Sequence, residues 1–111
     1  SDGTQLRDFT YIDDVINAIV KSLSNKKTNG QIINIGSGRP LKIKKIIEQI
    51  RRITRGGIPN YGAIKLRKDE IIKLYPSTTK AKKLLNWNTR ISFKTGLIRT
   101  INFYKKNPNY A

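Results

Sequence analysis

Two arginines and one acid are the side chains in this sequence whose types and spacing best suit ligand chemistry. Arg7 ends a short β-compatible stretch, where a guanidinium could clamp a diphosphate through two parallel hydrogen bonds. Arg67 and Glu70 are three residues apart, so the arginine could hold phosphate while the carboxylate accepts ribose hydroxyls. Plainer interpretations stay open. Arg7 could be a surface arginine that pairs with Asp8 or Asp14. Arg67 and Glu70 could form an exposed ion pair that contributes little to stability.

Two further patterns resemble cofactor or catalytic motifs but fail in detail. Residues 36–38 (Gly-Ser-Gly) lie between an expected strand and an expected helix, as in a dinucleotide-binding loop. The third glycine of that loop is replaced by Leu41, and Pro40 removes an amide that a phosphate would need. Tyr61 and Lys65 have the spacing of a catalytic tyrosine–lysine pair, but the surrounding glycines and Pro59 disfavour the helix that such a pair requires. We therefore interpret the first as a tight turn and the second as coincidence.

The residue inventory excludes several chemistries outright. The sequence has 0 cysteines and 0 histidines, which removes disulfides, thiolate catalysis, the commonest metal ligand and the usual base at neutral pH. We predict no catalytic residue and no metal site in this chain. No apolar run reaches membrane-spanning length and no secretory signal is present, which favours a cytoplasmic protein without a membrane partner.

Charge is the strongest compositional feature. Lys and Arg number 23 against 7 Asp and Glu, a net charge of +16, so phosphate-bearing ligands should be attracted. The basic residues are spread along the chain, which favours a solvated basic surface over one dedicated groove. A small nucleic-acid-binding module remains an alternative, but it would need exposed aromatics beside clustered charge. Most aromatics fall instead at expected core positions: Phe9, Trp87, Phe93 and Tyr104.

Hydrophobic periodicity predicts an α/β chain with short strands and about four helices in a single domain, residues 1–111. Helices are expected over 12–23 and 43–53, after an N-cap at Ser77, and after an N-cap at Ser92. Asp13 and Asp14 suit the first turn of the first helix as caps, and Trp87 should anchor the end of the third. Strands are expected over 5–10 and 31–35, with an edge strand over 63–67.

Four segments, in order, resemble the carboxy-terminal part of extended short-chain dehydrogenases of the NAD-dependent epimerase/dehydratase family. They are QLRDFTYIDDVINAIV, QIINIGSGRPLKIKKIIEQI, LRKDEIIKLYPSTTKAKKLLNW and ISFKTGLIRTINFYKKN, and together they cover nearly the whole chain. The resemblance implies a small substrate-binding region that lacks the Rossmann cofactor domain. It also implies that Arg7 and Arg67 contact the diphosphate of a nucleotide-sugar. Lys68 and Asp69 replace the family's common Pro-Gly, so either Asp69 or Glu70 could take the ribose contact.

The same resemblance sets expectations for activity. The family's NAD-binding loop and helical tyrosine–lysine pair are missing, so this chain should be inactive alone and bind no cofactor, as a fragment of a larger enzyme. The parent would use NAD, bound by the missing domain, as a nucleotide-sugar isomerase or lyase supplying surface polysaccharide. Expected partners are a nucleotide-diphosphate sugar, the missing Rossmann domain and, through exposed apolar surface, a second copy in a homodimer. Pairing with a separate Rossmann chain is a further alternative.

Overall fold

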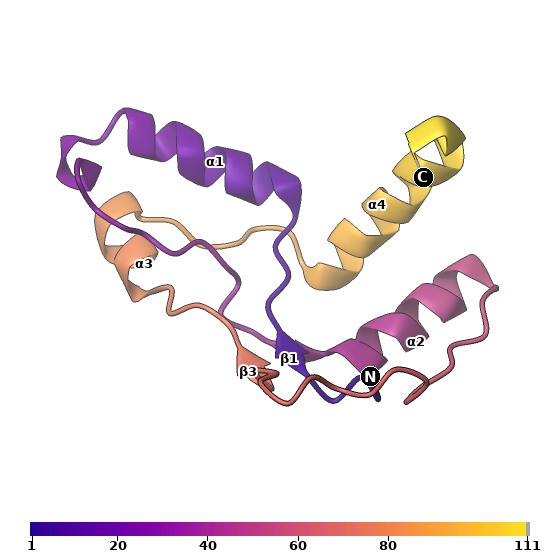
Figure 1. Ribbon diagram of the computed structural model, residues 1–111. Helices are drawn as coiled ribbons and strands as arrows, with labels where there is room; N and C mark the ends of the chain where they lie inside the picture. Colours follow the sequence, from indigo (N-terminus) through magenta and orange to yellow (C-terminus); the bar gives the residue numbers. More distant parts are fainter. Residues whose placement is uncertain (111) are drawn as a thin grey trace.

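The computed structural model describes residues 1–110, and its elements confirm a small α/β fold with four α-helices (Figure 1). The helices are α1 (Ile12–Leu23), α2 (Ile43–Thr54), α3 (Thr79–Leu85) and α4 (Phe93–Lys106). The strands are β1 (Leu6–Arg7), β2 (Leu41–Lys42) and β3 (Lys73–Leu74), and two 3₁₀ turns cover Lys26–Thr28 and Pro108–Tyr110.

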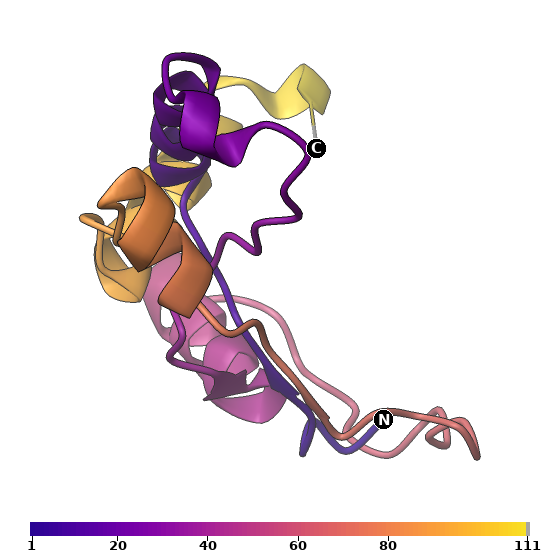
Figure 2. The same ribbon diagram turned by 90° about the vertical axis from the view of Figure 1, so that its left-hand side faces the viewer.

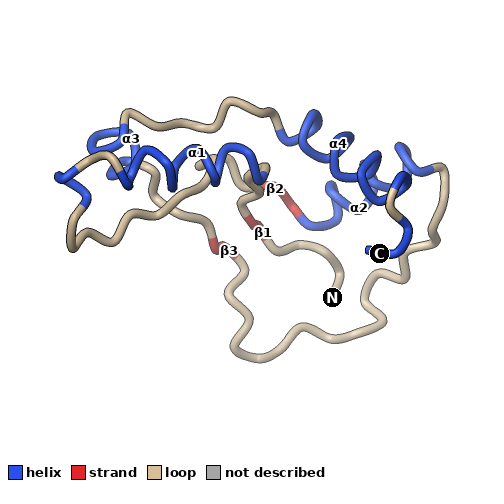
Figure 3. Tube along the Cα trace, turned by 90° about the horizontal axis from the view of Figure 1, so that it is seen from above, coloured by secondary structure: helices blue, strands red, loops and turns tan. Residues whose placement is uncertain are grey.

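The three strands form one small sheet in the order β2-β1-β3. β1 pairs antiparallel with β2, and it pairs parallel with β3 through Leu6 opposite Lys73 and Arg7 opposite Leu74. A long segment without helix or strand leaves the end of α2 and returns to β3 (Figure 3). The central strand therefore joins the two parts of the chain that carry Arg7 and Glu70.

Two of the strand predictions are wrong in the described residues. Residues 63–67 form turns and irregular structure, and the strand beside β1 is β3 instead. Residues 31–35 show the burial alternation of a strand: Ile33 and Ile35 pack toward the core, while Ile32 is 85% exposed. Within 1–110, however, this segment has no hydrogen-bonded partner strand. Alternation in sequence shows which side chains face inward, but not whether another strand lies alongside.

The main core lies between α1 and α3, which stack side by side (Figures 1 and 2). Its buried members are Ala18, Ala81, Leu85 and Trp87, the last only 2% exposed. Two side chains on α1 and its C-terminal turn secure the end of α3: Lys21 Nζ donates to the Leu85 carbonyl at 3.2 Å, and Asn25 Nδ2 donates to that of Leu84 at 2.6 Å. The expected anchoring role of Trp87 is confirmed.

A second packing layer joins α2 to α4. The rings of Phe9 and Phe93 meet edge to face at 5.7 Å, and Ile46 is buried on α2. Gly96 permits close approach on α4, because a Cβ atom there would lie 3.0 Å from the ring of Tyr11. The predicted cap at Ser92 is confirmed, since its Oγ accepts from the amide of Thr95 at 3.2 Å.

Three details of the sequence interpretation need correction. The third helix is capped from Thr78 rather than Ser77, and Thr78 makes no side-chain capping bond. Phe9 and Tyr104 are exposed rather than in the core, because α4 and the stretch before α1 are packed on one side only. Their exposure weakens the argument against a nucleic-acid-binding module, because that argument placed both aromatic side chains in the core.

The acidic pair in α1 does not cap the helix as expected. Asp14 is 3% exposed, and its carboxylate accepts the backbone amides of Arg90 at 3.1 Å and Ile91 at 3.0 Å. It therefore ties α1 to the segment that leads into α4. Asp13 points outward, 3.6 Å from Arg99 on α4. The pattern of two acids in a first turn fits capping equally well, so only the tertiary fold reveals these partners.

One face of α1 remains uncovered. Its apolar stripe is exposed along the length of the helix, with Leu23 reaching 81%. The radius of gyration is 16.5 Å, against about 13 Å for a compact domain of this length. The chain is thus more open than a self-contained domain. The exposed members of the stripe are Ile12, Ile16, Ile19, Val20 and Leu23.

Candidate functional site

Arg7 is held in place by the sheet. Its NH1 group donates to the carbonyls of Leu6 at 2.9 Å and Ile71 at 2.8 Å, so both N–H bonds of that group are used by backbone. The NH2 group donates to Glu70 Oε1 at 2.5 Å. These hydrogen bonds fix the orientation of the guanidinium, while the Arg7 side chain as a whole stays 25% exposed. Among residues 1–110, no acceptor lies against its Nε.

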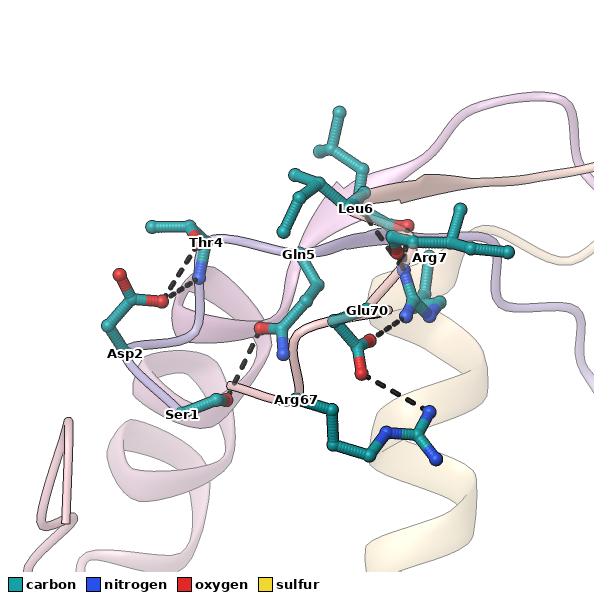
Figure 4. A network of polar contacts seen from close by, with 10 residues as sticks. Ser1, Asp2, Thr4, Gln5, Leu6, Arg7, Arg67 and Glu70 are labelled. Carbon is teal, nitrogen blue, oxygen red and sulfur yellow. Dashed lines mark hydrogen bonds and ion pairs between the residues drawn. The ribbon is translucent and has the colours of Figure 1, made fainter. Parts of the chain in front are cut away.

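Glu70 lies between two guanidinium groups. Its second oxygen, Oε2, accepts from Arg67 NH2 at 3.4 Å (Figure 4). The Glu70 side chain is 14% exposed, whereas that of Arg67 is 77% exposed. The structure therefore brings together Arg7, Arg67 and Glu70 across a sequence separation of 63 residues. Two cations that converge on one carboxylate have the charge and donor geometry to hold a larger anion.

The structure places the remaining acids elsewhere. Asp69 is exposed and makes no hydrogen bond or ion pair with the described part of the chain, so Glu70 is the acid that meets the arginines. The alternative prediction that Arg7 forms a surface ion pair with Asp8 or Asp14 is wrong, because Arg7 pairs with Glu70 instead. The predicted ion pair between Arg67 and Glu70 is present, but Arg7 contacts the same carboxylate.

An open hollow of about 510 Å³ lies beside Arg7 at the end of the sheet. Sequence reasoning missed Tyr75 and Asn34, which lie on its wall. The signal for Tyr75 is its position directly after β3, a strand too short to recognise from its pattern. The full lining consists of Arg7, Asp8, Asn34, Ile35, Leu74, Tyr75 and Pro76.

The glycine turn at 36–38 does not fit a dinucleotide. Asp8 accepts the amide of Ser37 through Oδ1 at 3.0 Å and that of Gly38 through Oδ2 at 2.6 Å. A carboxylate already takes the amides that would receive a phosphate. Gly36 is needed for close approach instead, because a Cβ atom there would lie 2.3 Å from Pro76 Cγ. The interpretation as a tight turn fits this geometry.

A polar latch ties the long segment after α2 back onto that helix. The Tyr61 hydroxyl donates to Glu48 Oε1 at 2.6 Å, and Arg51 contacts the other Glu48 oxygen at 2.9 Å. The Lys44 ammonium lies 4.9 Å from the centre of the Tyr61 ring. Tyr61 therefore serves as an anchor, and no helix aligns it with Lys65. The latch fixes the start of the segment that carries Arg67 and Glu70.

The latch predicts a pH dependence with two limits. The hydrogen bond to Glu48 raises the pKa of Tyr61 above 10.0, and the same bond lowers the pKa of Glu48 below 4.5. The contribution of Tyr61 to the stability of the folded chain is therefore complete below pH 10.0, and it is lost as pH rises through the raised pKa. The contribution of Glu48 to the same stability is complete above pH 4.5, and it is lost as pH falls through the lowered pKa.

Ultraviolet titration of tyrosinate, as the difference between the chain and Tyr61→Phe, measures the upper limit. We expect one tyrosine that ionises above 10.0, and Glu48→Gln should bring that ionisation back toward the ordinary value. An unchanged titration in Glu48→Gln would show that the latch does not form in solution.

Comparison with known proteins places this chain in one family. A family model described as GDP-mannose 4,6 dehydratase matches residues 1–100. UDP-glucuronate 4-epimerase of Thermodesulfobacterium geofontis is 42% identical over 107 residues, covering 96% of this chain and 32% of that protein. CDP-abequose synthase of Salmonella muenchen is 34% identical over 95 residues, covering 84% of this chain and 32% of that protein.

A solved structure agrees in three dimensions. UDP-glucuronic acid 4-epimerase from Bacillus cereus, in complex with UDP-glucuronic acid and NAD, aligns with a TM-score of 0.82 and 34% identity. The alignment covers 96% of this chain and 34% of that protein. The chain belongs to the NAD-dependent epimerase/dehydratase family, within the extended short-chain dehydrogenases. It spans about a third of the length of the relatives it matches.

Two features are absent from residues 1–110. No helix there combines the length and apolar character that crossing a bilayer requires. No cluster of three or more His, Cys, Asp or Glu side chains is placed to hold a metal ion in the same residues.

Proposed function

We propose that this chain binds the diphosphate and ribose of a nucleotide-sugar, as the substrate-binding part of an NAD-dependent epimerase or dehydratase. The observation that carries the proposal is the convergence of Arg7 and Arg67 on Glu70. Of these three residues, Arg7 also lines the open hollow at the end of the sheet. A diphosphate carries its charge on oxygens that planar guanidinium groups recognise through paired hydrogen bonds. A carboxylate next to them accepts hydrogen bonds from sugar hydroxyls.

The relatives support the substrate class. UDP-glucuronate 4-epimerase and CDP-abequose synthase carry nucleotide-sugars in their names, and the Bacillus cereus structure holds UDP-glucuronic acid with NAD. Sugars activated in this way are building blocks of polysaccharides, so we assign the parent activity to surface-polysaccharide synthesis in the cytoplasm. Epimerisation and dehydration both remain within the proposal.

The chemical step requires protein beyond these residues. The described part of the chain contains no helical tyrosine–lysine pair, and its glycine turn is occupied by Asp8, so NAD would be bound elsewhere in the parent. The uncovered apolar face of α1 and the open shape suit packing against such a cofactor domain. Alone, the chain is proposed to bind substrate without turning it over.

Calorimetric titration of the full chain with UDP tests the proposal. Arg7→Ala should weaken UDP binding about 10- to 100-fold, because charge-assisted hydrogen bonds to the diphosphate contribute about 1.5–3 kcal/mol. Arg99→Ala provides a control with the same charge change, since Arg99 lies on α4 and contacts Asp13. Equal losses in both variants would mean that general positive charge attracts UDP, and the site assignment would then be wrong.

A further inference from the structure

The Glu70 carboxylate occupies the position between the two cations where an anionic ligand would bind. Its oxygens contact Arg7 at 2.5 Å and Arg67 at 3.4 Å. Both N–H bonds of Arg7 NH1 are used by backbone carbonyls, so a ligand that forms two bonds to Arg7 must use Nε and the NH2 group that Glu70 already contacts. An incoming phosphate therefore competes with Glu70 for the same donor.

Displacing Glu70 has an energetic consequence that depends on the ligand. The side chain is 14% exposed, so a carboxylate that loses its arginine is left poorly solvated. A phosphate without other polar groups offers it no replacement donor, and two negative groups then share one pocket. A ligand that joins the diphosphate to neighbouring hydroxyls supplies those donors and restores the hydrogen bonds of the carboxylate.

We propose that Glu70 acts as a built-in counter-ion that makes the site select hydroxyl-bearing diphosphates and reject bare phosphates. This inference rests on the proposed function and deepens it, because it explains how so basic a chain avoids filling its site with inorganic anions. The net charge of +16 attracts any phosphate, so discrimination must come from a group inside the site. Glu70 is the only acid with an ion pair to Arg7 or Arg67 in residues 1–110.

The experiment compares UDP with inorganic pyrophosphate on the same full chain by calorimetric titration, at one ionic strength. The native chain is expected to prefer UDP. Glu70→Gln keeps the shape of the side chain but removes its charge. It should raise the affinity for pyrophosphate about tenfold and leave the affinity for UDP unchanged. The ratio of UDP affinity to pyrophosphate affinity should therefore fall about tenfold. Asp13→Asn is the control, because it removes one negative charge from the surface near Arg99. It should leave the preference unchanged.

The outcomes separate the inference from the proposed function. If UDP binds through Arg7 but Glu70→Gln keeps the native preference, the counter-ion role is overturned and the binding site stands. If neither probe binds the native chain, the proposed function itself fails. Should Glu70→Gln not fold, Glu70→Asp tests the competition for the Arg7 donor while keeping the negative charge. Its shorter carboxylate reaches fewer donors, so pyrophosphate should bind about threefold more tightly. An unchanged affinity would count against the inference.

Discussion

A chain carrying Trp87→Ala is expected to lose about 3–5 kcal/mol of its free energy of unfolding, as large-to-small changes of buried aromatics do. Trp87 is 2% exposed and packs with Ala18, Ala81 and Leu85 between α1 and α3. Because small single domains are stabilised by only about 5–15 kcal/mol, this loss would remove a large share of the stability of the chain.

Urea denaturation followed by far-ultraviolet circular dichroism measures that loss without relying on tryptophan fluorescence. Trp87→Phe should fall between the native chain and Trp87→Ala, because it keeps a ring but loses the bond from Nε1 to the Asp14 carbonyl, 3.1 Å in the native chain. Tyr110→Ala is the matched aromatic deletion at an exposed site, with an expected change within about 0.5 kcal/mol. A loss in Tyr110→Ala as large as in Trp87→Ala would contradict the assigned core.

Asp14→Ala is expected to lower the free energy of unfolding by about 2–4 kcal/mol, since it removes a buried carboxylate and leaves two part-buried amides without an acceptor. The amides belong to Arg90 and Ile91, and the carboxylate accepts from them at 3.0–3.1 Å. The adjacent Asp13→Ala changes the same residue type on a side chain that is 59% exposed, so it should change stability by less than about 1 kcal/mol.

The same denaturation measurement compares these two acids directly. If both substitutions destabilise equally, the effect belongs to the acidic first turn of α1 rather than to the contact before α4. The double variant Asp14→Ala with Trp87→Phe should lose less than the sum of the two, because both residues join the same pair of segments.

Much of the helical structure could be predicted from the sequence, because each helix carries its own apolar period. Residues 12–23 show this period most clearly, although the two acids in the first turn do not cap that helix. The end signal at Ser92 is confirmed. Side-chain chemistry and the family resemblance single out Arg7, Arg67 and Glu70 from the sequence, and the structure brings these three side chains together. Choosing Glu70 over Asp69 as the partner of the arginines required the fold, because adjacent residues on an irregular segment differ only in direction.

The strands and the long-range polar contacts could not be predicted in this way. Strands of two residues, such as β2 and β3, are too short for any alternation to appear. The acceptor role of Asp14 depends on residues 76 and 77 positions away, and nothing near Asp14 indicates them. The segment 31–35 has the alternating pattern of a strand. Whether it forms hydrogen bonds with a partner strand depends on which segment lies beside it, and its own residues do not indicate that.

The arrangement of the sheet also has a kinetic consequence. Arg7 and Glu70 meet across 63 residues, and the strand that aligns them pairs in parallel with a distant strand. Closing so long a loop is entropically slow, whereas α1 and α2 contain mostly local contacts. The helices should therefore form early and the proposed ligand site only at the final step of folding. A ligand that bound both Arg7 and the segment of Glu70 would hold these late-formed elements together, so its presence would slow the unfolding of the whole chain.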